Sequence, residues 1–442
     1  VTGGPGILNA LTGIAGAFTD SIAMVVVAGQ VKTETLSDND RELRQLGDQE
    51  VRTLSIVSSL SKYSVRLSAT LVGEQVTDAF DHAVTGRPGP VVLEVPLDVQ
   101  ATDLGEYAAS KGSKNSVKQT PDLNDEDLET LLALLRQAER PLIMAGSGVS
   151  IAGVRDDLIA LAEVSNIPVV TAWMHDVFDS HHPLSAGRSG TIGTRPGNFA
   201  VQSADFLLVL GSRLNIRQTG YNFAQFAPNA RVFWIDVDPA ELRKSHLPIE
   251  HRVVADLKKA MPKICDAVND RPLPVRKEWL DWIVWIKRLE PQDADYPTSE
   301  KGINPYHFLS EVNRSLSAGT VLACGDATAC IVPFQVVDIR DGIRMFSNSG
   351  IASMGFDLPA AIGASVATDQ PVVCFAGDGS IMMNLQELAT LASLDRDVLV
   401  FILDNKGYLS IRQTQQNFFG RAFGSGPDSG VHFPNFESVA SA

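Results

Sequence analysis

The fold is decided by one stretch of the sequence, VVCFAGDGS, which occupies residues 372–380. Its first five residues form a short apolar run of the kind that builds a buried strand. A three-residue apolar repeat follows and predicts one helix, which would contain Met382, Leu385, Leu388, Leu391 and Leu394. A second apolar run at 398–403 predicts another strand. Strand, helix and strand in this order indicate a crossover between two parallel neighbours, and hence an α/β fold.

Two polar residues stand where these predicted strands end. Asp378 follows the first strand and Asn405 follows the second, and open α/β sheets bind ligands at the carboxyl ends of their strands. A carboxylate and an amide oxygen suit Mg²⁺, which keeps other ligand positions for phosphates and water. Gly377 and Gly379 let the backbone approach a diphosphate closely. The alternative is an ordinary turn in which Asp378 caps a helix, but the position of Asn405 in the same crossover favours the metal site.

Composition limits the class of protein. A chain of 442 residues predicts two or three domains of about 150 residues each. The net charge of −15 argues against a nucleic-acid partner, which calls for a basic face. No apolar run reaches the roughly 18 residues that span a membrane. The four cysteines form no CxxC pair, so we expect reduced thiols in a cytoplasmic protein.

Alternating strand and helix patterns predict three doubly wound parallel-sheet domains. Their predicted ranges are 1–105, 122–270 and 303–442, separated by a polar linker and by a bridge rich in Pro and Trp. The strands predicted in the first two domains are 23–28, 90–95, 141–145, 168–171, 206–210 and 232–236, and the helices are 72–83 and 156–164. In the bridge, Trp279, Trp282 and Trp285 are three residues apart, which predicts a helical face packed on a neighbouring domain.

Four separated segments carry further information. They read TGGPGILN at 2–9 with AGQV at 28–31, GRPGPV at 86–91, SGIASMGFDLPAAIGA at 349–364, and the GDG and DN motifs described above. Together, and in this order, they resemble the acetolactate-synthase-like branch of the thiamin-diphosphate (ThDP) enzymes. The resemblance covers essentially the whole chain. It implies a pyrimidine-binding domain, a central domain of the FAD type and a diphosphate-binding domain, in that order.

The resemblance implies a metal and cofactor site in the third domain. The Mg²⁺ ligands would be Asp378, Asn405 and the carbonyl of Gly407. The metal would hold the diphosphate of ThDP against the turn formed by Gly377, Asp378, Gly379 and Ser380. Met354 matches the residue that props the cofactor into a bent shape, and the alternative for it is a core methionine.

Two further residues match catalytic positions of the family. Gln49, in a Gln49-Glu50 pair, resembles a residue near the active-site channel, and the alternative is a solvated polar loop. Gln413 is retained in the helix that follows Asn405. The glutamate that activates the cofactor lies upstream of the segment that matches 2–9, so it is absent from this chain. Since there is also no initiator Met, and the last residues look like the start of a helix, we expect a fragment at both ends.

The resemblance implies decarboxylation of a 2-keto acid such as pyruvate with C–C bond formation, with the cofactor as electron sink. Three positions depart from the synthase: Leu97 replaces a lysine, and Ser410 and Thr414 replace a methionine and a tryptophan of the acceptor pocket. These changes predict a larger and more polar pocket. They leave open an acceptor such as a nucleotide keto-sugar, the hydrolysis of a cyclic diketone, or a non-catalytic protein that only binds cofactor or a partner subunit.

The central domain raises the question of FAD. Gly146, Gly211, Arg213 and Asp236 match positions of the FAD-binding synthases and could hold a dinucleotide. The alternative is that these turns serve packing, and both remain open. In the family, ThDP lies between the first domain of one subunit and the third domain of another, so a homodimer or homotetramer is expected.

Overall fold

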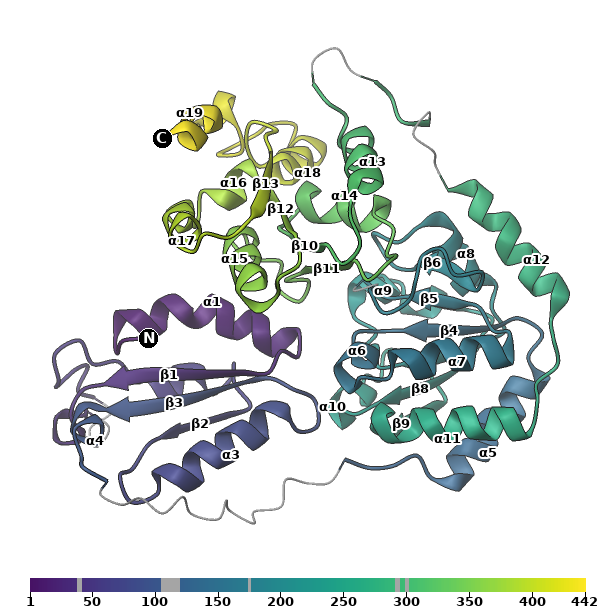
Figure 1. Ribbon diagram of the computed structural model, residues 1–442, viewed down its shortest axis with the longest axis horizontal. Helices are drawn as coiled ribbons and strands as arrows, with labels where there is room; N and C mark the ends of the chain where they lie inside the picture. Colours follow the sequence, from purple (N-terminus) through teal and green to yellow (C-terminus); the bar gives the residue numbers. More distant parts are fainter. Residues whose placement is uncertain (38–41, 105–119, 174–175, 291–294, 299–301) are drawn as a thin grey trace. The chain divides into compact units, whose positions relative to one another are not determined.

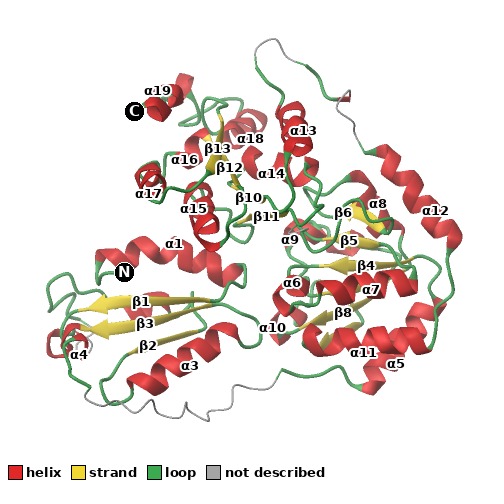
Figure 2. Ribbon diagram, viewed as in Figure 1, coloured by secondary structure: helices red, strands yellow, loops and turns green. Residues whose placement is uncertain are grey.

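The computed structural model describes residues 1–37, 42–104, 120–173, 176–290, 295–298 and 302–442. Most of the predicted linker therefore lies outside the described residues. The chain divides into two compact units, Val1–Thr120 with Ser349–Ile351, and Pro121–Asn348 with Ala352–Ala442. The first unit contains one parallel sheet and the second contains two (Figure 1). Helices lie on both faces of each sheet, which confirms three doubly wound α/β folds (Figure 2).

The N-terminal sheet has the strand order β1-β3-β2, and all its strands run parallel. Its elements are α1 (Pro5–Thr19), β1 (Met24–Gln30), α2 (Thr53–Val57), β2 (Tyr63–Arg66), α3 (Val72–Val84), β3 (Pro90–Pro96) and α4 (Leu97–Gln100). Side chains alternate between the two faces along β3: Val92 packs with α1, whereas Val91 and Leu93 pack with α3. The predicted strands at 23–28 and 90–95 and the helix at 72–83 are confirmed, whereas β2 and α1 were not predicted.

The middle sheet has six parallel strands in the order β6-β5-β4-β7-β8-β9. Its strands are β4 (Pro141–Ala145), β5 (Val169–Thr171), β6 (Ser185–Arg188), β7 (Phe206–Leu210), β8 (Arg231–Asp236) and β9 (His251–Val254). Its helices are α5 (Asp125–Gln137), α6 (Gly148–Ala152), α7 (Arg155–Ser165), α8 (Arg195–Ser203), α9 (Ile216–Thr219), α10 (Pro239–Leu242), α11 (Leu257–Asp270) and α12 (Lys277–Ile286). All four predicted strands and the helix at 156–164 are confirmed.

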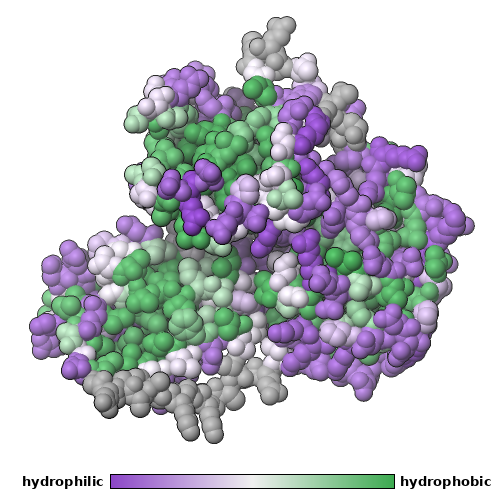
Figure 3. Space-filling view, viewed as in Figure 1, coloured by the Kyte–Doolittle hydropathy of each residue, from purple (hydrophilic) through white to green (hydrophobic). Residues whose placement is uncertain are grey.

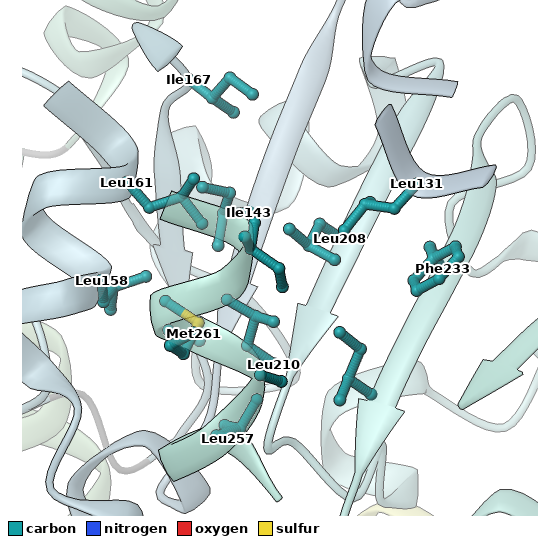
Figure 4. Packing of buried hydrophobic residues seen from close by; sticks show 14 of the residues in the cluster. Leu131, Ile143, Leu158, Leu161, Ile167, Leu208, Leu210, Phe233, Leu257 and Met261 are labelled. Atoms are coloured by element: carbon teal, nitrogen blue, oxygen red, sulfur yellow. The ribbon is translucent and has the colours of Figure 1, made fainter. Parts of the chain in front are cut away.

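Every residue of β4 and β7 is buried, because helices cover both faces of these central strands. On one face, Ile143 and Leu208 pack against Leu158 and Leu161 of α7 and Met261 of α11 (Figure 4). The opposite face is covered by α8 and α12. Continuous apolar runs are what a parallel strand buried on both faces requires, which explains why these strands could be read from sequence.

Helix α12 corrects the prediction for the tryptophans. Trp279 is buried and its indole N–H donates to the carbonyl of Pro141 at 2.8 Å, but Trp285 is 52% exposed. Six residues span about 1.7 turns of a helix, so the two rings cannot share one face. Ile283 and Ile286, four and seven residues after Trp279, complete the buried face.

The C-terminal sheet has the order β11-β10-β12-β13, again parallel throughout. Its strands are β10 (Val321–Cys324), β11 (Arg344–Ser347), β12 (Val372–Gly377) and β13 (Val398–Leu403). Its helices are α13 (Pro305–Ser315), α14 (Thr328–Val336), α15 (Asp357–Ala367), α16 (Asp378–Ile381), α17 (Glu387–Ser393), α18 (Leu409–Phe419) and α19 (Phe436–Ser441). The predicted parallel pairing of the strands at 372–376 and 398–403 is confirmed.

The single helix predicted after the GDG motif is wrong. Two short helices, α16 and α17, are separated by a turn at 382–386. The turn brings the side-chain amide of Asn384 to the carbonyl of Gly355 at 2.6 Å. A local apolar repeat contains no information on such a distant partner, so the break could not be predicted. No helix in the described part of the chain is long and apolar enough to cross a membrane.

Candidate functional site

Strand order predicts where a ligand would bind on the C-terminal sheet. β11 pairs on one side of β10, whereas β12 and then β13 follow on the other side, so the strand order reverses between β10 and β12. In open α/β sheets, ligands bind outside the carboxyl ends of the strands at such a reversal. Cys324 at the end of β10 pairs with Phe375 of β12, so the two turns that follow these strands are neighbours.

Asp378 lies in the turn after β12, and its side chain faces the turn after β13. The residue is 2% exposed, and its carboxylate accepts hydrogen bonds from the amides of Gly379 and Gly407, both at 2.8 Å. The bond to Gly407 joins the two turns that the sequence predicted to meet. Burial, with the neighbouring Asp404 carboxylate, raises the pKa of Asp378. The capping alternative is not supported, because the N-cap of α16 is Gly377 and no side chain caps that helix.

Asn405 supplies the strongest sign of an external ligand. Its side-chain oxygen Oδ1 is buried and has no hydrogen-bond partner among the described residues. A buried acceptor without a partner costs free energy, so such an atom calls for an explanation. A hard cation held jointly by Asp378 and Asn405 would satisfy this oxygen. The residues at this position therefore fit Mg²⁺.

The loop that carries Asn405 is held in place by the chain itself. The guanidinium of Arg412 donates to the carbonyl oxygens of Asn405 at 3.1 Å and Lys406 at 3.2 Å. Gly407 has φ +126°, and a Cβ atom there would lie 2.5 Å from the carbonyl oxygen of Ser425. Only glycine fits this position, so the loop shape is set before any ligand arrives.

The turn that carries Met354 is hydrogen-bonded to the turn after β12, residues 377–380, which is called the metal turn because it carries Asp378. The amide of Gly355 donates to Ser380 Oγ at 2.9 Å, and the Ser380 hydroxyl donates to Asp357 at 2.5 Å. Met354 itself is 39% exposed, which does not agree with the core-methionine alternative. The Ser380 hydroxyl makes both of these bonds within the protein, and the place of Ser380 in the cofactor-binding turn stays a prediction. Gly377, in contrast, has no close neighbour: a Cβ there would meet only Ser380 Cβ, at 3.9 Å.

The N-terminus of α14, beside the carboxyl end of β10, was not found from the sequence. α14 begins at Thr328, directly after the turn that follows β10, and no side chain caps its N-terminus. The residue before it, Ala327, has φ +50°. Unpaired amides at a helix N-terminus favour phosphate groups. The only sequence signal was the short apolar run 321–324, followed by Gly325.

Gln49 and Glu50, in the N-terminal unit, have opposite environments. Gln49 is exposed, with φ +60°, whereas Glu50 is only 4% exposed. From the described residues, the Glu50 carboxylate accepts hydrogen bonds from Ser37 N and Oγ at 2.6 and 2.7 Å, Leu46 N at 2.9 Å and Gly47 N at 3.1 Å. Burial alone would raise the pKa of Glu50, but these bonds outweigh it and lower the pKa to about 2. The solvated-loop alternative is therefore wrong for Glu50, which is a structural anion.

The predicted acceptor-side residues are accessible. Ser410, Gln413 and Thr414 are exposed on α18, and the Thr414 hydroxyl donates to the Ser410 carbonyl at 3.0 Å. Leu97 begins α4 in the N-terminal unit and is 52% exposed. Because all four side chains are exposed and not packed in a hydrophobic core, each can contact a ligand.

The glycines of the middle sheet pack against each other. The amide of Gly148 donates to the carbonyl of Gly211 at 2.9 Å, and a Cβ on Gly146 would lie 2.4 Å from the same oxygen. Asp236 is buried and accepts from the amide of Asp238 at 2.9 Å. These contacts support the packing alternative for the turns. FAD binding by Gly146, Gly211, Arg213 and Asp236 stays a prediction.

Comparison with known proteins gives matches in the same order as the three sheets. Family models of thiamine pyrophosphate enzymes match residues 1–56 (N-terminal TPP binding domain), 128–264 (central domain) and 326–442 (C-terminal TPP binding domain). The acetolactate synthase large subunit of Parasynechococcus marenigrum is 35% identical over 450 residues, covering 99% of this chain and 70% of that protein.

Two further relatives match over a similar share of the chain. The probable acetolactate synthase large subunit of Methanocaldococcus jannaschii is 32% identical over 455 residues, covering 99% of this chain and 74% of that protein. The acetolactate synthase isozyme 1 large subunit of Escherichia coli K12 is 32% identical over 420 residues, covering 94% and 71%.

Proposed function

Since this chain belongs to the acetolactate-synthase-like family of ThDP enzymes, we propose that it binds ThDP through Mg²⁺ and decarboxylates a 2-keto acid such as pyruvate with C–C bond formation. The proposed metal ligands are the Asp378 carboxylate, the Asn405 side-chain oxygen and the Gly407 carbonyl. One observation carries the proposal: Asn405 Oδ1 is buried without a partner among the described residues, in the same loop whose Gly407 amide donates to Asp378.

When bound, ThDP supplies the electron sink for decarboxylation. The contribution of this chain is to bind and orient it. The uncapped N-terminus of α14 and Gly377 of the GDG turn favour the diphosphate, because no side chain caps the helix and a Cβ on Gly377 would meet only Ser380 Cβ. Ser380 holds the Met354 turn in place, and the partly exposed Met354 side chain is available to contact the rings of ThDP.

The acceptor is proposed to be larger or more hydroxylated than pyruvate. Ser410 and Thr414 present two small polar side chains on the exposed surface of α18, and Gln413 stands between them. Hydroxyl and amide groups bind hydroxyl-rich ligands through hydrogen bonds. This observation favours, as a second candidate, a nucleotide keto-sugar acceptor over the hydrolysis of a cyclic diketone.

We also propose a homodimer or homotetramer. Large apolar side chains remain exposed on the N-terminal unit, among them Val27 at 52%, Phe80 at 55% and Val84 at 61%. Figure 3 shows apolar surface gathered over the elements of this unit. Exposed apolar surface of this kind is typical of protein interfaces.

The test is pyruvate consumption by the natural protein with ThDP and Mg²⁺, with the product identified by mass spectrometry. Consumption that requires both cofactors, and that is lost in Asp378→Ala, is the expected result. Acetolactate as the main product would favour pyruvate as acceptor, whereas a larger adduct formed with added keto-sugar would favour the second candidate. ThDP-bound protein that consumes no 2-keto acid would contradict the proposal.

A further inference from the structure

Asp357 is a buried carboxyl group with no part in the function proposed so far. It is 0% exposed and stands at the start of α15. One carboxyl oxygen accepts the Ser380 hydroxyl at 2.5 Å, and the other accepts the amide of Leu358 at 2.9 Å. Ser380 Oγ in turn accepts the amide of Gly355 at 2.9 Å. Asp357, Ser380 and Gly355 thus form a continuous chain of hydrogen bonds.

The carboxyl group of Asp357 also packs against the turn that follows β10. A Cβ atom on Gly325, the residue after β10, would lie 2.5 Å from Asp357 Oδ2. Ser380 belongs to α16, which follows β12. Asp357 therefore lies between the two turns that border the reversal of strand order, and it is bonded to one and packed against the other.

A second hydrogen bond ties the Met354 turn to the same region. The Asn384 side chain donates to the carbonyl of Gly355 at 2.6 Å, so both backbone polar groups of Gly355 are bonded to residues that follow β12. Gly355 has φ +81°, and a Cβ there would lie 2.7 Å from Met383 Cβ. Only glycine therefore fits at this close approach beside Met354.

We propose that Asp357 is a positioning residue: through Ser380 it locks the Met354 turn to the metal turn, so that both halves of the cofactor site form one rigid frame. The inference rests on the proposed function. Asp357 touches neither substrate nor cofactor in this role. A frame that is ordered before binding loses less entropy when ThDP arrives, and fully satisfied buried networks of this kind are rigid.

The experiment measures the Kd of ThDP at saturating Mg²⁺, by quenching of tryptophan fluorescence in the natural protein. The variants are Asp357→Ala, Ser380→Ala and the double variant. Each single change is expected to weaken ThDP binding about 10-fold, because loss of an outer-shell partner typically costs that much. The double variant is expected to be little weaker than either single one, since both break the same link. Asp357→Asn keeps an acceptor for Ser380 and is expected to restore binding to nearly the wild-type Kd.

Ser365→Ala is the matched control. Ser365 is a buried serine of the same helix, and its hydroxyl donates to the Ile362 carbonyl at 2.8 Å. Its loss is expected to lower the melting temperature without changing the Kd of ThDP.

Two results would overturn the positioning role while wild-type protein binds ThDP normally. One is a wild-type Kd in folded Ser380→Ala with only a stability loss like that of Ser365→Ala. The other is a double variant weakened about 100-fold, which would mean two independent effects. If Asp357→Ala does not fold, Ser380→Ala and Asp357→Asn still decide the question. Wild-type protein that binds no ThDP would overturn both the positioning role and the proposed function.

Discussion

The middle and C-terminal sheets have the same kind of architecture but use it differently. Each is parallel, and each reverses its strand order at the centre, between β4 and β7 in one and between β10 and β12 in the other. In the middle sheet the turns after these strands close on each other, with Gly148 bonded to Gly211 at 2.9 Å. In the C-terminal sheet the turns after β12 and β13 meet through the hydrogen bond from the Gly407 amide to Asp378, and the buried side-chain oxygen of Asn405 is left without a partner among the described residues.

We infer from this difference that a glycine-rich turn at a strand end need not be a binding site. The physical distinction is whether the backbone and side-chain polar groups are already satisfied within the protein. Turns that satisfy each other contribute packing, whereas a turn that leaves a buried acceptor unpaired is stabilised by a ligand. Four substitutions test this comparison, and they follow from the largest expected effect to the smallest.

Asp378→Ala should have the largest effect. It removes a metal ligand, so we expect ThDP binding in the presence of Mg²⁺ to weaken more than about 100-fold, since even outer-shell changes cost about 10- to 100-fold. Titration calorimetry measures it. Asp236→Ala, a change at the end of β8 in the middle sheet, should leave the affinity for ThDP unaltered. Equal losses in the two variants would mean that the two sheets do not differ as described.

Gly211→Ala should damage stability and not cofactor binding. Gly211 has φ +56°, and its added Cβ would lie 2.7 Å from the Cα of Gly148. We expect the free energy of unfolding to fall by about 2–3 kcal/mol from backbone strain and overpacking, with the Kd of ThDP unchanged. Urea denaturation and a ThDP titration check this. Gly363→Ala is the control, because it lies in a helix with nothing near its added Cβ and should be neutral or stabilising by about 0.5–1 kcal/mol.

Asn405→Ala should move binding and stability in opposite directions. Mg²⁺-dependent ThDP binding is expected to weaken about 10-fold or more with loss of the ligand oxygen. The metal-free protein should be as stable as wild type, or more stable by about 1 kcal/mol, because an unsatisfied buried acceptor is removed. Thermal melts with EDTA and with Mg²⁺ plus ThDP separate the two effects. By contrast, Asn124→Ala removes the cap of α5 and should lower stability by about 1 kcal/mol without affecting ThDP. Lower metal-free stability with unaltered binding in Asn405→Ala would reduce Asn405 to a structural role.

Glu50→Gln should show the smallest and most pH-dependent effect. Glu50 is a carboxylate whose partners all come from the protein, and its pKa is lowered from 4.5 to about 2. Its stabilisation is therefore complete above the ordinary pKa and is lost as pH falls through about 2. We expect the difference in free energy of unfolding between wild type and Glu50→Gln to be constant near pH 7 and to shrink below about pH 4.5. Urea titrations followed by circular dichroism measure it, and a difference that grows on acidification would contradict the assignment.

The parts of the fold that could be predicted from sequence are those encoded by local patterns. β4 and β7 are continuous apolar runs, and their predicted bounds agree with the structure at every residue. β6, in contrast, reads SAGR and contains no apolar run. It is a strand only because β5 lies beside it and supplies hydrogen-bond partners. The break in the helix after α16 likewise depends on Asn384 reaching Gly355, a residue 29 positions away.

The candidate site divides in the same way. Sequence alone determined that an acid and an amide stand at the ends of two adjacent parallel strands, because strand, helix and strand follow one another along the chain. Only the tertiary structure decided that Asn405 Oδ1 has no hydrogen-bond partner in the described part of the chain, that Gly146 packs on Gly211, and that Asp357 joins two turns. The physical reason is that hydrogen bonding and close packing are satisfied between residues far apart in sequence, so no local pattern records which polar groups remain unpaired.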